Sequence, residues 1–160
     1  GEFEKRIGGF GVELTKVART ARGDIHAVTE LPVLLPDADI VLLAVPLSDE
    51  TRGMVDSAFL DRLPTGALVV NVSRGPIVDT DALVARLRTG AVRSALDVVD
   101  PEPLPDGHPL WSAPRVVITS HSADTPEMTV PLLAERIRAN VAAVHGGGGF
   151  VGLVDPRAGY

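Results

Sequence analysis

The chain has 160 residues, with 15 Lys and Arg against 21 Asp and Glu, and a net charge of −6 with His neutral. Hydrophobic residues make up 45% and charged residues 22%, a composition that fits a folded globular domain and excludes a disordered chain or a coiled coil. The acidic balance argues against nucleic acid and acidic membranes as partners, so we expect a small molecule or another protein. Cysteine is absent, which excludes disulfides and thiolate zinc sites.

The start of the chain has no features of a targeting segment. It begins at Gly1 without Met and lacks both the basic start and the apolar run of a signal peptide. The longest apolar stretch, residues 40–45, is far shorter than the roughly 20 residues of a membrane-spanning helix. We therefore expect a cytoplasmic protein whose sequence begins inside a secondary-structure element.

Five short segments are predicted to be strands. Residues 12–17 alternate between apolar and polar side chains, whereas 40–45 and 67–72 are almost continuously apolar and rich in β-branched residues. Segments 92–98 and 116–119 are two further candidates. Continuous apolar runs of this length are typical of a parallel sheet that is covered on both faces.

Segments with helical spacing alternate with these strands. They cover residues 30–35, 56–63, 80–88 and 126–144. Asp79 is a typical N-cap for the third segment, and Gly90 is a typical stop signal after it. The alternation predicts an α/β fold with about five or six parallel strands, right-handed crossovers and helices on both faces.

Polar side chains follow three of the expected strands. Arg74 follows the third strand, Glu102 the fourth and His121 the fifth. Ligands of open α/β sheets bind outside the carboxyl ends of the strands, so these side chains are expected to line one rim. A guanidinium binds a carboxylate through two parallel hydrogen bonds, and an imidazole beside a carboxylate transfers a proton near neutral pH. Each residue alone has an ordinary structural explanation, but together they predict a site for an anionic oxo-acid.

The remaining histidines are interpreted as structural. His26 and His145 are isolated in polar surroundings, and His108 is expected to hold a turn against Trp111. No two histidines have the i, i+2 or i, i+4 spacing of a metal site with an acid nearby. We therefore expect no bound metal.

Five motifs follow one another in the order of a known enzyme family. They are residues 39–47 (DIVLLAVPL) with 50–53 (ETRG), 70–79 (VNVSRGPIVD), 95–105 (ALDVVDPEPLP), 108–111 (HPLW) and 117–121 (VITSH). Over essentially its whole length, the chain resembles the C-terminal half of the D-isomer-specific 2-hydroxyacid dehydrogenases. The resemblance implies a Rossmann-like domain over residues 1–145, and a linker and tail over 146–160 that would return to the substrate domain.

The resemblance also implies roles for the residues of the rim. Arg74 matches the arginine that binds the substrate carboxylate and carbonyl, His121 the acid/base, and Glu102 its carboxylate partner. Asp97 matches the residue that holds the nicotinamide carboxamide. The other expected cofactor-lining residues are Val45, Pro46, Thr51, Val72 and Ser73.

Three features depart from the family pattern. Ser120 stands where the family usually has a proline before its catalytic histidine, and Val99 stands where an aromatic residue is common. The first strand and the Gly-rich phosphate loop are missing, because residues 2–10 resemble the end of the helix that follows that loop. Residues 8–11 contain three glycines but are interpreted as a helix end turning into a strand, since a phosphate loop follows a strand and opens a helix.

The cofactor choice is predicted from the region after the first expected strand. Enzymes that use NAD commonly place an acid at the end of the second Rossmann strand, whereas those that use NADP place an arginine and small polar residues there. After this strand the chain has Arg19, Thr20 and Arg22, and no acid stands between Val17 and Asp24. We therefore expect an NAD(P)H enzyme with a mild preference for NADP(H). The alternative is that both arginines are solvated loop residues around an NAD pocket.

The expected function is hydride transfer between a nicotinamide cofactor and a D-2-hydroxy acid or 2-keto acid, of the glyoxylate, hydroxypyruvate or phosphoglycerate type. Two alternatives are a non-catalytic nucleotide-sensing protein of the same fold and an inactive truncated domain. Retention of Arg74, Glu102 and His121 together argues against the sensing protein, which needs no proton donor. Residues 48–63 resemble part of the family's dimer surface, so we expect a homodimer.

Overall fold

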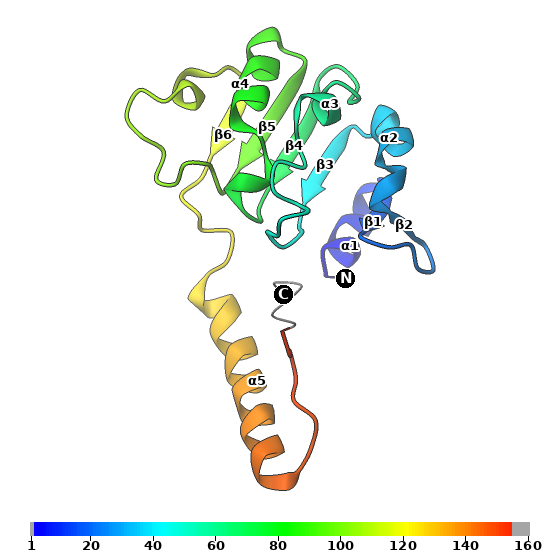
Figure 1. The fold of residues 1–160 in the computed structure, drawn as a ribbon, viewed down its shortest axis with the longest axis vertical. Helices are drawn as coiled ribbons and strands as arrows, with labels where there is room; N and C mark the ends of the chain where they lie inside the picture. The colour runs from blue at the N-terminus through cyan, green and yellow to red at the C-terminus, as the bar shows by residue number, and fades with distance from the viewer. Residues whose placement is uncertain (1, 155–160) are drawn as a thin grey trace.

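A parallel sheet of four strands forms the centre of the computed structural model, which describes residues 2–154 (Figure 1). The strands are β3 (Ile40–Leu43), β4 (Ala67–Asn71), β5 (Val92–Leu96) and β6 (Val116–Ile118), in that spatial order. Four of the five expected strands are thus confirmed, each ending one or two residues earlier than predicted. The carboxyl ends of all four strands meet at one edge, because the strands are parallel.

The N-terminal region forms a separate pair of parallel strands. They are β1 (Lys16–Ala18) and β2 (Ile25–Ala27), with Lys16 in register with Ile25. β1 is shorter than the strand expected over 12–17, and β2 was not predicted, because three residues are too few to produce a periodic pattern. The two strands are not hydrogen-bonded to the four-stranded sheet.

The glycine-rich stretch before β1 ends a helix. Helix α1 (Glu2–Ile7) continues into the 3-10 turn η1 (Gly8–Phe10), and Gly11 has a φ of 67°. Glycine adopts this left-handed conformation without strain, which makes it the usual residue after a helix. The interpretation of residues 8–11 as a helix end is therefore confirmed.

Helix α4 (Thr80–Thr89) has the ends that the sequence predicts. An Asp79 side-chain oxygen accepts a hydrogen bond from the Ala82 backbone N–H at 3.0 Å, and Gly90 has a φ of 75°. Helix α3 (Ser57–Leu60) begins in the same way, with Asp56 accepting from the Phe59 N–H at 2.8 Å. α3 is shorter than the helix expected over 56–63.

The helix expected over residues 30–35 is broken into short turns. It consists of η2 (Val28–Glu30), α2 (Leu31–Leu34) and η3 (Leu35–Asp37). Pro32 and Pro36 each lack a backbone N–H, so a continuous ladder of helical hydrogen bonds is not possible. Two further 3-10 turns, η4 (Gly75–Ile77) and η5 (Pro109–Ser112), lie in the loops beyond β4 and β5.

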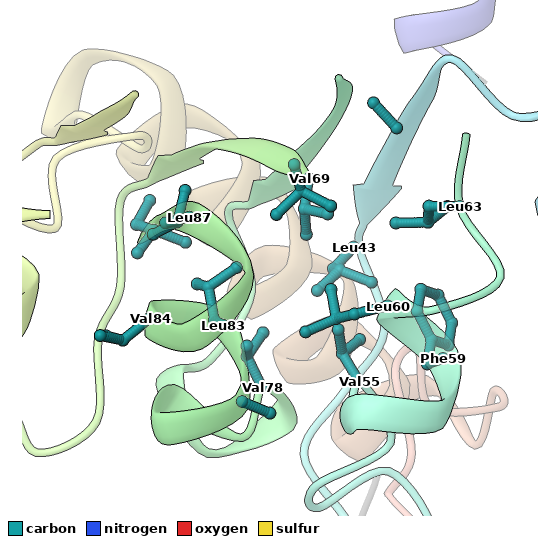
Figure 2. Packing of buried hydrophobic residues seen from close by; sticks show 14 of the residues in the cluster. Leu43, Val55, Phe59, Leu60, Leu63, Val69, Val78, Leu83, Val84 and Leu87 are labelled. Atoms are coloured by element: carbon teal, nitrogen blue, oxygen red, sulfur yellow. The ribbon is translucent and has the colours of Figure 1, made fainter. Parts of the chain in front are cut away.

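The hydrophobic core lies between the sheet and helices α3 and α4 (Figure 2). Val69 of β4 points toward Leu60 of α3 and Leu83 of α4, and all three side chains are almost completely buried. Each such side chain contributes about 1.5–3 kcal/mol by leaving water. On the opposite face of the sheet, Ile40 and Val117 are 60% and 62% exposed. The described helices therefore cover mainly one face.

Helix α5 (Pro126–Gly146) extends away from the sheet, and the residues after it run back beside it (Figure 1). Asn140 holds this return segment, because its side chain accepts from the Val151 N–H at 2.8 Å and donates to the Val151 carbonyl at 3.1 Å. Several large apolar side chains of α5, including Leu132 and Leu133, are exposed. Within residues 2–154, no helix is both long and apolar enough to cross a membrane.

Candidate active site

The predicted catalytic residues lie on loops that leave the same edge of the sheet. Arg74 follows β4, Glu102 lies in the loop after β5, and His121 follows β6. These three strands are direct neighbours. The parallel topology therefore brings residues far apart in sequence to one rim, as the sequence predicts.

Glu102 and His121 form a hydrogen-bonded pair. Nδ1 of His121 lies 2.6 Å from Oε1 of Glu102, and the two side chains are 42% and 39% exposed. An ionised carboxylate only accepts hydrogen bonds, so Nδ1 carries the shared hydrogen and Nε2 is left for another partner. Half exposure keeps Nε2 within reach of a small ligand. The pair therefore has the arrangement of an oriented acid/base.

The backbone of His121 has an unusual conformation. Its φ of 54° lies in the left-handed region, which costs free energy for a residue with a side chain. Such a conformation persists only where the neighbouring residues are firmly held. The residues that follow His121 are held by hydrogen bonds from their backbone N–H groups to Asp97.

Asp97 anchors the loop that carries His121. Oδ1 accepts from the Thr119 hydroxyl at 2.5 Å and the Ser122 N–H at 2.9 Å, and Oδ2 accepts from the Ala123 N–H at 2.8 Å. Burial alone would raise the pKa of Asp97, but these hydrogen bonds and the nearby His121 outweigh burial and lower its pKa. Asp97 is therefore ionised at neutral pH, with lone pairs remaining on Oδ2 for one more donor.

A buried asparagine holds the segment that contains Arg74. Asn71 is fully buried at the end of β4, and its Oδ1 accepts from both the N–H and the hydroxyl of Ser73 at 3.0 Å. Its Nδ2 donates to the Arg74 carbonyl at 2.9 Å. The exposed Arg74 guanidinium donates to the Ser73 carbonyl at 2.6 Å. Asn71 was not predicted as a site residue, although a polar side chain on the buried face of a strand indicates such a role.

Gly75 allows the Arg74 segment to lie against the loop after β5. A Cβ atom at this position would lie 1.9 Å from the Val99 carbonyl oxygen, which is far inside van der Waals contact. The Thr80 hydroxyl adds a hydrogen bond to the Asp100 carbonyl at 2.8 Å. These contacts hold the Arg74 and Glu102 segments side by side.

A mainly apolar pocket of about 270 Å³ opens beside these loops. Thr119, Ser122 and Ala123, which flank His121 in sequence, line one part of it. Two predicted cofactor residues, Val72 and Asp97, also line it. The remaining lining residues are Val70, Ala95, Leu96 and Val117. The pocket therefore offers apolar walls with a carboxylate and a hydroxyl at one side, which suits a flat ring with a polar substituent.

The loop after β3 contains three other predicted cofactor residues. Thr51 holds this loop closed, because its hydroxyl donates to the Pro46 carbonyl at 2.8 Å and accepts from the Ser48 N–H at 2.8 Å. Val45 packs against the hydrophobic core. These side chains and Ser73 are not among those that line the apolar pocket.

The predicted phosphate-binding residues lie beyond β1. Arg19, Thr20 and Arg22 are all exposed. The Arg19 guanidinium forms an ion pair with Glu50, which belongs to the loop after β3. Sequence reasoning did not identify Glu50 as part of this region, because the two residues are 31 positions apart and no local pattern connects them.

The other histidines differ in how well they were predicted. His108 holds the turn before Trp111 as expected, because its Nδ1 accepts from the Leu110 N–H at 3.2 Å. The prediction that His26 is isolated was wrong, since its Nδ1 lies 2.9 Å from Oε2 of Glu30. The i, i+4 spacing of the two residues was the available signal. Within residues 2–154, no group of three or more His, Cys, Asp or Glu side chains is placed to hold a metal ion.

Residues 1–123 match the sequence profile of the D-isomer specific 2-hydroxyacid dehydrogenase, NAD binding domain. The chain belongs to this family. The resemblance carried by the five motifs is thus confirmed. The arrangement of the described strands and helices is that of a Rossmann-type 2-hydroxyacid dehydrogenase.

Individual 2-hydroxyacid dehydrogenases resemble the chain over most of its length. A glyoxylate reductase of Thermofilum pendens is 36% identical over 147 residues, covering 88% of this chain and 43% of the relative. A glyoxylate/hydroxypyruvate reductase A of Yersinia enterocolitica is 33% identical over 163 residues, covering 97% of this chain and 51% of the relative. The chain therefore spans about half the length of these curated relatives.

A solved structure in the same family is also similar. It is a D-isomer specific 2-hydroxyacid dehydrogenase of Xanthobacter autotrophicus in complex with NADPH and MES. It matches with a TM-score of 0.84 and 36% identity, covering 98% of this chain and 66% of that chain.

Proposed function

We propose that the protein is an NAD(P)-dependent oxidoreductase that transfers a hydride between the nicotinamide and a D-2-hydroxy acid or 2-keto acid. The observation that carries this proposal is the Glu102–His121 hydrogen bond at the edge of the sheet, next to an apolar pocket. A residue pair of this kind supplies a proton at a defined point. Membership of the family supports the same reaction class.

The three rim residues have separate roles in this proposal. In the direction of reduction, His121 gives the proton on Nε2 to the oxygen on C2 of the keto acid. Glu102 keeps the imidazole in the correct tautomer and stabilises its charged form. Arg74 binds the substrate carboxylate and opposes the negative charge that develops on the oxygen. A nicotinamide cofactor, when bound, would supply the hydride for C2 of the keto acid.

The apolar pocket fits the nicotinamide ring. Val72, Ala95 and Val117 provide apolar walls, and Asp97 and Thr119 lie at the polar side. Among residues 2–154, Oδ2 of Asp97 accepts one hydrogen bond, so a carboxamide N–H would find a lone pair there. We assign Val45, Pro46, Thr51 and Ser73 to other parts of the nucleotide.

We further propose that the protein prefers NADP(H) mildly over NAD(H). Arg19, Thr20 and Arg22 support this proposal, since arginines suit a ribose phosphate and the stretch contains no acid. The similar Xanthobacter autotrophicus structure contains NADPH. A kcat/KM that is far higher with NADH than with NADPH would contradict this preference.

The proposed substrates are small 2-keto acids of the glyoxylate and hydroxypyruvate type, which the names of the two curated relatives support. The test uses the full-length protein and follows the oxidation of NADPH and NADH with glyoxylate or hydroxypyruvate. His121→Ala should lower kcat by about 10²–10⁴-fold, the usual contribution of a general acid. Turnover that is unchanged in this variant would contradict the assigned proton transfer.

The domain organisation and assembly are part of the same proposal. Residues 1–145 would form the nucleotide-binding domain, and residues 146–160 a linker and tail that returns to the substrate domain; residues 1 and 155–160 lie outside the described residues. We propose a homodimer whose surface includes residues 48–63. Light scattering on the full-length protein tests the dimer, and a monomeric mass would contradict it.

A further inference from the structure

One ion pair connects the two parts of the fold at the predicted cofactor site. Arg19 comes directly after β1 of the small strand pair, and Glu50 belongs to the loop after β3 of the four-stranded sheet. Nη2 of Arg19 contacts Oε2 of Glu50. The side chains are 48% and 64% exposed, so a nucleotide can reach both of them. The contact therefore places a carboxylate beside the arginine that we assign to the ribose phosphate.

We propose that Glu50 is a specificity-determining residue, which competes with the 2′-phosphate of NADP for Arg19 and so limits the preference for NADP over NAD. This inference rests on the proposed cofactor binding. Enzymes that use NAD place an acid at the end of the second Rossmann strand, and this chain has none there before Asp24. The fold instead brings Glu50, from a different loop, into contact with Arg19 directly after β1.

Electrostatics gives the direction of the effect. A 2′-phosphate carries up to two negative charges at neutral pH, so it is repelled by the Glu50 carboxylate and must share the Arg19 donors with it. The 2′-hydroxyl of NAD is uncharged and can donate a hydrogen bond to a carboxylate. Glu50 therefore weakens NADP binding and does not weaken NAD binding.

The size of the effect follows from the exposure of the pair. Exposed ion pairs are weak and are screened by salt. We therefore expect removal of the Glu50 charge to change the ratio of NADPH affinity to NADH affinity by about two- to five-fold at low salt. The change should become smaller as salt is added.

The experiment measures dissociation constants of NADPH and NADH by calorimetry on the full-length protein. Glu50→Gln should raise the affinity ratio in favour of NADPH. Asp49→Asn is the matched control, because it removes the same charge from the adjacent exposed residue. In an Arg19→Gln background, Glu50→Gln should change the ratio less, since the competition for the guanidinium is gone and only direct repulsion of the phosphate remains.

Three results would overturn the inference. They are an unchanged ratio in Glu50→Gln, an equal change in Asp49→Asn, and a change that is just as large without Arg19. If the unaltered protein binds neither nucleotide, the proposed function fails and this inference fails with it. If both nucleotides bind but the ratio does not respond, only the role of Glu50 is contradicted.

Discussion

Glu102 and His121 are nineteen residues apart in sequence, yet Oε1 of the first lies 2.6 Å from Nδ1 of the second. The contact exists because β5 and β6 are neighbouring parallel strands whose carboxyl ends meet. The carboxylate therefore fixes which imidazole nitrogen is left for another partner. Removal of the Glu102 carboxylate should therefore lower kcat more than it changes the KM for the substrate.

Glu102→Gln should lower kcat at least about tenfold, because an amide neither fixes the tautomer nor favours the charged imidazole. The KM for the keto acid should change much less, since Arg74, the proposed partner of its carboxylate, is unchanged. Steady-state kinetics on the full-length protein measures both constants. Asp106→Asn, an exposed acid of the same loop, is the control and should leave kcat unchanged. Equal kcat values for both variants would contradict the role of Glu102.

Asp97 should make the protein sensitive to acid. Its pKa is lowered from the ordinary value of 3.8, so the folded state binds this proton more weakly than the unfolded state. The contribution of Asp97 to stability is therefore complete above the ordinary pKa and is lost as the pH falls through the lowered value. Asp97→Asn should cost about 1–3 kcal/mol at neutral pH, and the difference should shrink below about pH 3.8. Urea denaturation across this range measures it; a difference independent of pH would contradict the prediction.

Asn71→Ala should affect both stability and substrate binding. The change removes the side chain that holds Ser73 and Arg74, and should cost about 1–3 kcal/mol in the free energy of unfolding. Because the Arg74 backbone loses its anchor, the KM for the keto acid should rise as well. Ser94→Ala is a matched control: Ser94 is buried in β5 and donates to the Val69 carbonyl at 2.9 Å, away from the rim. Ser94→Ala should lower stability without raising KM, and an equal rise in KM for both variants would contradict the role of Asn71.

Gly75→Ala should destabilise the protein strongly. The added methyl group would clash with the Val99 carbonyl, which is backbone and cannot turn away. Overpacking of this kind costs about 1–3 kcal/mol or more. Gly146→Ala is the control, because the added Cβ would meet nothing within 4 Å beyond its chain neighbours and its own helix backbone. Thermal unfolding compares the two variants, and an equal Tm would show that the close approach does not matter.

The sequence predicted those parts of the fold that have a local signal. Helix α4 has both an N-cap at Asp79 and a stop at Gly90, and strands β3, β4 and β6 are mainly apolar runs between turn residues. The segment over 30–35 was predicted less well, because the pattern of apolar residues outweighed the effect of Pro32 and Pro36. The short β2 has no such pattern. It is defined by its pairing with β1, which only the folded chain shows.

The residues of the candidate site also differ in how strongly the sequence indicated them. Proximity of Glu102 and His121 was predictable from strand order alone, because parallel strands end at one edge. Asn71 had a weaker signal, since it shares the buried face of β4 with Val69 but is polar. No signal in the sequence indicated the Arg19–Glu50 ion pair. It depends on how the small strand pair sits beside the sheet, and this is decided by packing across the whole chain.

Asn71 also binds a second loop, because its backbone carbonyl accepts from the Asp97 N–H at 2.9 Å. One residue thus couples the arginine segment to the aspartate that anchors the histidine. Neither the Arg74 segment nor the Asp97 segment can move away alone without breaking hydrogen bonds to Asn71 at the buried end of β4. We therefore expect the Arg74 and Asp97 segments to move together in any opening of this rim, with the hinge in other segments.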